Sequence, residues 1–404
     1  MKPNNEPPYN SASTDFTDAG PPASKRRRRT ALLVLPVAAA SIGAVAINQL
    51  ASTESAFTVA SPSETGVTAA TRAPLDEQDI AAAILDDARS LDGSGNNLDD
   101  ATLGQAGQNC TRVVPANYAD GVGEPVEGRP DERYLSNRIF NDSNQNIFSE
   151  NGVTHWGFVW GQLVDHTIGL RAVGDEEMVI EFDPADPLEA FTNDLGGIAT
   201  TRSAVADGTG IDSPREQVNT LSSYIDAWAV YGGTAKRLDW LREGTVDGDP
   251  TNNDATLLNN AGYLPTAASR DGVDAPETDL VGRLFADPDG AVIAGDVRVN
   301  ENIGLTAAHT LLLREHNRIV ESLPDDLDEE LKFQIARRVV AAELQYITYT
   351  EFLPAMGVEL AAYAGYDPSV DPSITNEFAT VGYRAHSQIH GEFEAEIPLD
   401  QLDD

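Results

Sequence analysis

The sequence predicts a mainly α-helical domain with long loops and few or no strands. Apolar residues recur at a helical period in several segments, and no long stretch alternates apolar with polar residues as a half-buried strand does. The segments are separated by loops rich in Gly, Asp, Asn and Pro, such as 247–254 and 271–279. With 404 residues, 41% of them hydrophobic, the chain can bury a large core.

The N-terminal part carries the pattern of an export signal. Residues 1–24 are polar and rich in Pro, Asn and Ser, which predicts disorder. The basic run 25–29 then precedes an apolar stretch over 31–50, and its paired arginines suit a twin-arginine export route. Because the apolar stretch is long enough to span a bilayer, an uncleaved anchor is the alternative to a cleaved signal.

We therefore expect an exported protein in which 25–50 is a signal or a signal anchor. The protein is then secreted, or it contacts a membrane only through 31–50. Residues 51–72 are rich in Ser, Thr and Ala, so they are expected to form a flexible linker. The folded domain is expected over 73–404.

The charge balance restricts the partners. The chain has 27 basic and 65 acidic residues, a net charge of −38, which argues against a nucleic-acid partner. An acidic surface with few lysines suits a saline habitat, where salt screens self-repulsion. Cys110 is the sole cysteine of the sequence, so an intrachain disulfide and a cysteine-based metal site are excluded. We expect Cys110 to be a small buried residue.

Apolar periodicity places the helices along the chain. In the first, Ile80, Ala83, Ile84 and Ala88 follow each other at helical spacing. The longest repeats this pattern with Leu331, Ile335, Val339, Ala342 and Leu344. Helices are predicted over 79–91, 160–170, 223–231, 304–323 and 329–352.

The predicted helix over 160–170 carries an unusual polar group. At helical spacing Gln162, Asp165 and His166 lie on adjacent ridges, so all three can point into one cavity, with apolar neighbours behind them. Taken alone, the segment is equally consistent with a helix whose polar stripe faces solvent. Two later segments favour the cavity.

The first of these is Gly-Asp-Val-Arg-Val-Asn-Glu over 295–301, directly before the helix that contains Leu-Leu-Leu-Arg-Glu-His-Asn-Arg. The second is Tyr-Arg-Ala-His-Ser-Gln-Ile-His over 383–390, which we also expect to be helical. Together with 160–170, in this order and at this spacing, they resemble the animal haem peroxidase family. The resemblance covers most of the chain, from 89–97 to its end.

The resemblance implies a helical domain of the haem peroxidase type. It also implies a prokaryote-type member of the family, with a role in the response to oxidative stress. Such a protein reduces hydrogen peroxide and oxidises a halide, a pseudohalide or a small phenolic reductant through an oxyferryl intermediate. One alternative is a protein that keeps the fold in an adhesive or structural role with little turnover. Others are a related haem fatty-acid dioxygenase and an unrelated helical binding domain with core histidines.

By this resemblance, His386 is the proximal ligand of the haem iron, and its structural alternative is a buried core histidine. His166 matches the distal histidine, which moves the peroxide proton as general acid and base. Arg298 matches the distal arginine, which offsets negative charge as the O–O bond breaks. Gln162 is expected to hydrogen-bond water or an anion in the same cavity.

Two carboxylates, Asp165 and Glu301, match those that form ester bonds to haem methyl groups, so we expect an ester-linked haem b derivative. Arg298 and Glu301 are three residues apart, which lets one turn present both. The ester pair counts against the dioxygenase alternative. Asn302 stands where a third, sulfonium link is found in myeloperoxidase, so that bond cannot form. Arg384 is expected near a haem propionate, because Tyr383 takes the usual arginine position.

Two departures from the family pattern concern calcium and the end of the domain. Of the expected calcium ligands, Thr167 replaces an acid and Trp228 replaces the last ligand. Calcium prefers six to eight oxygens with several carboxylates, and this set keeps only one carboxylate. The family also supplies an asparagine to the proximal histidine from beyond Asp404, so we expect the C-terminal part of the domain to be missing. The remaining candidate calcium ligands are Ser222, Tyr224 and Asp226.

Overall fold

The computed structural model describes residues 77–141, 149, 152–191 and 193–384, which fall within one compact unit spanning Val59–Asp404. The predictions for 1–24, 25–50 and 51–72 lie outside the described residues, as does the segment 385–390 that carries His386. Within the described ranges, no helix has both the length and the apolar character needed to cross a membrane.

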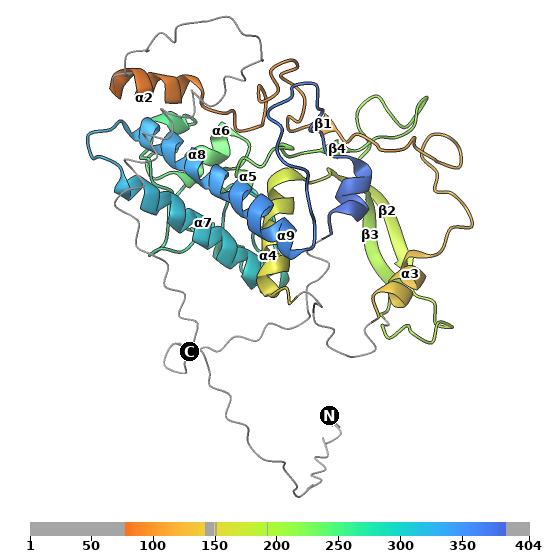
Figure 1. The fold of residues 1–404 in the computed structure, drawn as a ribbon. Helices are drawn as coiled ribbons and strands as arrows, with labels where there is room; N and C mark the ends of the chain where they lie inside the picture. The colour runs from red at the N-terminus through yellow and green to blue at the C-terminus, as the bar shows by residue number, and fades with distance from the viewer. Residues whose placement is uncertain (1–76, 142–148, 150–151, 192, 385–404) are drawn as a thin grey trace, which may run out of the picture. The chain divides into compact units, whose positions relative to one another are not determined.

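Long helices dominate the fold and confirm its predicted class (Figure 1). The helix predicted over 160–170 begins earlier, at His155, and ends at Ile168, while the one predicted over 79–91 ends at Asp86. The main helices are α2 (Glu77–Asp86), α3 (Glu132–Ile139), α4 (His155–Ile168), α7 (Ile303–Ser322) and α8 (Glu329–Ile347). Shorter helical segments are α5 (Trp228–Tyr231), α6 (Ala235–Leu241), α9 (Leu353–Ala355), η1 (Pro250–Asn252), η2 (Gly282–Phe285), η3 (Pro288–Gly290), η4 (Thr348–Phe352) and η5 (Phe378–Gly382).

Side-chain caps fix where α7 and α8 begin. The Asn302 side chain accepts a hydrogen bond from the amide of Leu305, which satisfies one unpaired donor at the start of α7. Asp328 accepts from two amides at the start of α8. These caps lie next to the predicted starts of both helices, and they place Glu301 at the last residue before the α7 cap.

The prediction of a helix over 223–231 is wrong for the first half of that range. Only α5 (Trp228–Tyr231) is helical. The Ser222 hydroxyl accepts a hydrogen bond from the Tyr224 amide, and Ala227 has a left-handed φ of 67°. Local side-chain bonding of this kind competes with helix formation, so 223–227 forms a turn despite its apolar residues.

The sequence carries no strand signal for the longer hairpin found among the described residues. Strand β2 (Val173–Glu181) pairs antiparallel with β3 (Gly197–Ser203), with Met178 opposite Thr200. Six of the nine residues of β2 are exposed and four are acidic, so the strand lacks the apolar alternation of a half-buried strand. The other pairing joins the two-residue strands β1 (Gln108–Asn109) and β4 (Val218–Asn219).

The main core lies between α4, α5, α7 and α8. These helices bring together large side chains that are fully buried, and α7 packs along α8 (Figure 1). Burial of such side chains is the main source of stability for a domain of this kind. Members of the cluster include Leu163, Tyr231, Trp240, Ile293, Leu305, Phe333 and Leu344.

Candidate active site

A cavity of about 410 Å³ brings together five of the residues singled out in the sequence. Its wall includes Asp165 and His166 from α4, Arg298 and Glu301 from the loop before α7, and Arg384 near the end of the described chain. Other wall residues come from β3 and from η5. Segments far apart in the sequence therefore meet at one cavity. Of the three polar residues predicted to face it from α4, Asp165 and His166 line it, whereas Gln162 is not among its wall residues.

The polar face of α4 points inward. Gln162 is 4% exposed and His166 is 2% exposed, whereas Asp165 lies half-buried on the adjacent ridge. Val159 and Leu163, on ridges next to these residues, are buried in the main core. Because Gln162 and His166 are themselves buried, the alternative of a solvated polar stripe is excluded.

Gln162 joins α4 to the loop before α7. Its Nε2 donates to Glu301 Oε2 at 2.6 Å, and its Oε1 accepts from Asn302 Nδ2 at 2.8 Å. Partial burial raises the pKa of Glu301, against the opposing effect of Arg298. Glu301 Oε2 also lies 3.6 Å from His166 Nε2. Gln162 thus holds the carboxyl group of Glu301 beside the imidazole.

Arg298 is buried beside two acids. Its guanidinium donates to Asp296 through Nε at 2.8 Å and Nη2 at 2.9 Å, and its Nη1 lies 3.6 Å from Asp165 Oδ2. Burial raises the pKa of Asp165 to about 6, although Arg298 and Arg384 favour its charged form. The sequence prediction gave Asp296 no role. An acid two residues before a buried arginine can nevertheless close a turn and pair with that arginine.

The cavity wall is rich in arginine, in contrast to the acidic chain as a whole. Arg171 and Arg202 line it in addition to Arg298 and Arg384. Arg202 pairs with Glu176 at 2.8 Å. Burial lowers the pKa of Arg171, and the nearby Arg384 adds to this effect. A hollow lined in this way favours an anionic ligand. Arg171 gave no sequence signal, because nothing in the pattern relates it to the other wall residues.

Cys110 also lines the cavity, and it is buried as predicted. Burial raises the pKa of its thiol, against the effect of Arg171 and Arg112. The side chain therefore stays uncharged at neutral pH.

The segment before His386 is attached to α4. The Tyr383 hydroxyl donates to the Gly161 carbonyl at 3.0 Å, and its ring lies 5.5 Å from that of Phe378. Burial raises the pKa of Tyr383 strongly, so the phenol stays protonated. The described chain thus reaches the cavity wall at Arg384, directly before the residues that include the expected iron ligand.

The hydroxyls of two candidate calcium ligands form hydrogen bonds within the protein, whereas Asp226 Oδ1 is buried without a hydrogen-bond partner among the described residues. Thr167 Oγ1 donates to the Leu163 carbonyl at 2.9 Å, and Ser222 Oγ donates to Asp226 Oδ2 at 3.3 Å. The Tyr224 carbonyl accepts from the Asp226 amide at 3.0 Å, and burial raises the pKa of Asp226 to about 6.

Asp226 is thus the only carboxylate in this candidate ligand set. Across the part of the chain that the structure describes, no three His, Cys, Asp or Glu side chains are placed to hold a metal ion. Calcium takes six to eight oxygens, of which this set supplies one carboxylate, so calcium binding stays a prediction.

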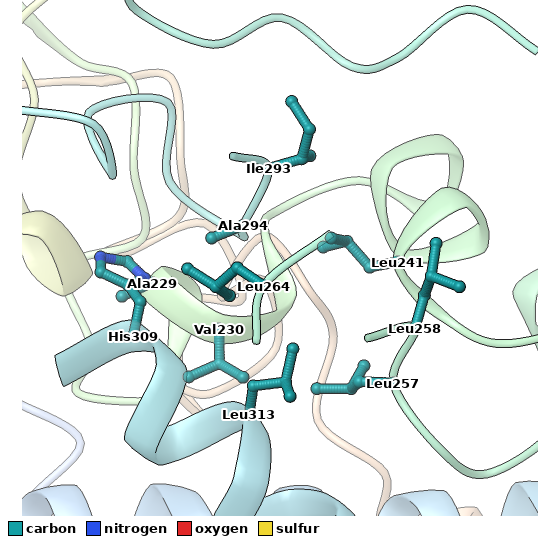
Figure 2. A pocket seen from close by; sticks show the side chains of 10 residues that line it. All are labelled: Ala229, Val230, Leu241, Leu257, Leu258, Leu264, Ile293, Ala294, His309 and Leu313. Carbon is teal, nitrogen blue, oxygen red and sulfur yellow. The ribbon is translucent and has the colours of Figure 1, made fainter. Parts of the chain in front are cut away.

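Two other histidines are core residues. His316 is fully buried, with Nδ1 2.8 Å from the Tyr231 hydroxyl and Nε2 2.9 Å from the Ala255 carbonyl. His309 lies against a small void of about 10 Å³, where Figure 2 shows its ring among aliphatic side chains. Burial lowers the pKa of each to about 4, so both are neutral at pH 7. Their role is in packing.

Comparison with known proteins agrees with this arrangement. Residues 88–397 match the model of the family described as animal haem peroxidase. The chain is 32% identical over 339 residues to peroxidasin of Drosophila melanogaster, which covers 73% of this chain and 22% of that protein. It is 30% identical over 354 residues to thyroid peroxidase of Sus scrofa, covering 75% of this chain and 37% of that protein. The chain thus spans less than half the length of these two relatives.

Solved structures show the same fold. Peroxidase A from Dictyostelium discoideum aligns with a TM-score of 0.56 and 26% identity, covering 73% of this chain and 58% of that one. A fatty acid alpha-dioxygenase of Oryza sativa aligns with a TM-score of 0.51 and 16% identity, covering 86% and 55% of the two chains, a likeness of fold alone. On the family match and the shared fold, the chain belongs to the animal haem peroxidase family.

Proposed function

We propose that this protein is a haem peroxidase that reduces hydrogen peroxide and oxidises a halide, a pseudohalide or a small phenol. The observation that supports the proposal most is the grouping of His166, Arg298, Asp165 and Glu301 on one cavity wall. Peroxide cleavage beside a haem uses a base and a cation, and the two carboxyl groups would attach the haem itself.

The residues of this wall suit a haem group. Asp165 and Glu301 are carboxyl groups with raised pKa values, and each would hold the edge of the ring through an ester bond. Arg171 and Arg384 would attract the two propionates. His386 would hold the iron, and the bound iron would supply the redox chemistry.

His166 and Arg298 would act on the peroxide itself. His166 lines the cavity, and its Nε2 lies 3.6 Å from Glu301, which lines the cavity too; this nitrogen would take the peroxide proton and return it to the other oxygen. Arg298, always protonated, would offset the negative charge that develops on the peroxide oxygens. Gln162 would orient Glu301 through its hydrogen bond and would also hold water near His166 and Arg298.

We further propose that the protein is exported, with 25–50 as its signal or anchor. The support is the basic run followed by the apolar stretch. Export would place the enzyme where small reductants and peroxide are both available, and the acidic surface would keep it soluble in salt.

An absorption spectrum tests the proposed function directly. Purified full-length protein supplied with haem is expected to show a Soret band that changes on addition of hydrogen peroxide, and to turn over a chromogenic phenol. The absence of a Soret band would contradict haem binding. A Soret band without turnover would instead favour the adhesive or structural alternative.

Ester bonds to the haem would make it resistant to extraction from the protein. After reaction with hydrogen peroxide, haem is expected to stay with the polypeptide in acidified organic solvent, because ester bonds survive that extraction. Asp165→Asn and Glu301→Gln are each expected to release more haem than wild type, and the double variant to release nearly all of it. Asp279→Asn, which changes an acid of the neighbouring loop that does not line the cavity, serves as the control. Free extraction of haem from the wild type would refute the ester bonds.

A further inference from the structure

Asp296 is a buried carboxylate at the centre of the site. It is 1% exposed and follows Gly295 in the loop before α7. Its Oδ1 accepts from the backbone amide of Arg298 at 3.0 Å, which closes a tight turn between the two residues. A buried carboxylate is costly unless charged partners surround it, so its position needs a compensating interaction.

Arg298 provides that interaction and is oriented by it. The Nε and Nη2 edge of the guanidinium donates to both oxygens of Asp296, at 2.8 and 2.9 Å. Because a guanidinium is planar, a two-point contact on this edge fixes its rotation. The remaining nitrogen, Nη1, is thereby directed toward Asp165, 3.6 Å from its Oδ2, on the cavity wall.

Asp296 also faces the imidazole of His166. Its Oδ1 lies 3.7 Å from His166 Nδ1, on the side of the ring opposite Nε2. A negative charge beside Nδ1 favours the tautomer that carries its hydrogen there. A charged Glu301 beside Nε2 would favour the other tautomer, but burial raises the pKa of Glu301 and weakens that opposing effect. The lone pair is then on Nε2, the nitrogen nearer Glu301 and the one that a general base at this cavity would use.

We propose that Asp296 is a positioning residue that sets both the orientation of Arg298 and the tautomer of His166. The expected effect of Asp296 on the reaction rate rests on the proposed peroxidase function. Its expected effect on the tautomer of His166 does not depend on that function. Asp296 touches neither substrate nor haem in this scheme, because both of its oxygens face Arg298 and His166.

The test compares Asp296→Asn with a matched control. An asparagine keeps the size of the side chain, but its amide hydrogens would meet the hydrogens of the guanidinium, so Arg298 must turn away. Asp239→Asn is the control, because Asp239 is also a fully buried carboxylate that accepts from a backbone amide, at Gly248, away from the cavity. Both variants are first compared with wild type by thermal unfolding.

Two measurements then separate positioning from general damage. In haem-loaded protein, Asp296→Asn is expected to lower kcat/KM for hydrogen peroxide about 100-fold, with KM for the phenol unchanged, while Asp239→Asn keeps the wild-type rate. In the haem-free full chain with ¹⁵N-labelled histidine, the His166 signal, assigned with His166→Gln, is expected to report hydrogen on Nδ1 in wild type and in Asp239→Asn. Asp296→Asn is expected to shift that population toward Nε2.

Several outcomes would overturn the proposal. Wild-type His166 with its hydrogen on Nε2 would do so even if Asp296→Asn fails to fold. So would an Asp296→Asn variant with wild-type rate and tautomer, or an equal loss of rate in both variants. If wild type has no peroxide turnover, the proposed function fails, and the tautomer measurement alone decides the role of Asp296.

Discussion

Replacing His166 with glutamine is expected to lower kcat/KM for hydrogen peroxide about 100- to 10,000-fold, the range that a positioned general acid–base group contributes. Glutamine is polar and of similar length, so it can fill the buried position between Asp296 and Glu301. It cannot accept and return a proton at neutral pH, however. The rate is measured at pH 7 with a chromogenic phenol and divided by the haem content of each preparation.

The control for this prediction is the same substitution at His309. That residue is also a buried helical histidine, but it lies in the main core and does not line the cavity. His309→Gln is therefore expected to keep the wild-type kcat/KM for hydrogen peroxide. A His166→Gln variant that binds haem and keeps a rate close to wild type would show that another group carries the proton.

His309 is expected to make stability depend on pH. Burial lowers its pKa from 6.5 to about 4, so the unfolded chain binds a proton near pH 6.5 that the folded chain resists until about pH 4. The stability that comes from keeping this ring neutral is present above pH 6.5 and is lost as the pH falls toward 4. Leucine at this position cannot bind a proton and fills the void beside the ring.

The measurement is the difference in free energy of unfolding between His309→Leu and wild type, obtained from denaturant titrations at several pH values. This difference is expected to grow in favour of the variant by about 3 kcal/mol between pH 7 and pH 4. Asp165 and Asp226 have raised pKa values and act with the opposite sign, but they are present in both proteins and cancel.

The control is the same comparison above pH 7. There the difference is expected to stay nearly constant, because His309 is neutral in both the folded and the unfolded chain. A His309→Leu difference that is equally flat between pH 7 and pH 4 would mean that His309 titrates in the folded protein much as it does in the unfolded chain.

Local sequence patterns predicted the long helices, because their apolar residues recur at the helical period. The repeat of apolar residues along 304–323 and 329–352 located α7 and α8, because a helix that packs on a core must bury one side. The same geometry predicted that Gln162, Asp165 and His166 share one face. Hairpin β2–β3 gave no such signal, since its strands are largely exposed and their pairing joins residues well separated along the chain.

The sequence by itself determined the helical class, the inward polar face of α4 and, through the order and spacing of its motifs, the family. Only the tertiary structure decided that Asp296 holds Arg298 and faces His166, that Arg171 joins the cavity wall, and that Ser222 donates to Asp226. The physical reason is that helical periodicity is a local property of the chain. The partner of a buried charge is set by which distant segments the core brings within a few ångströms.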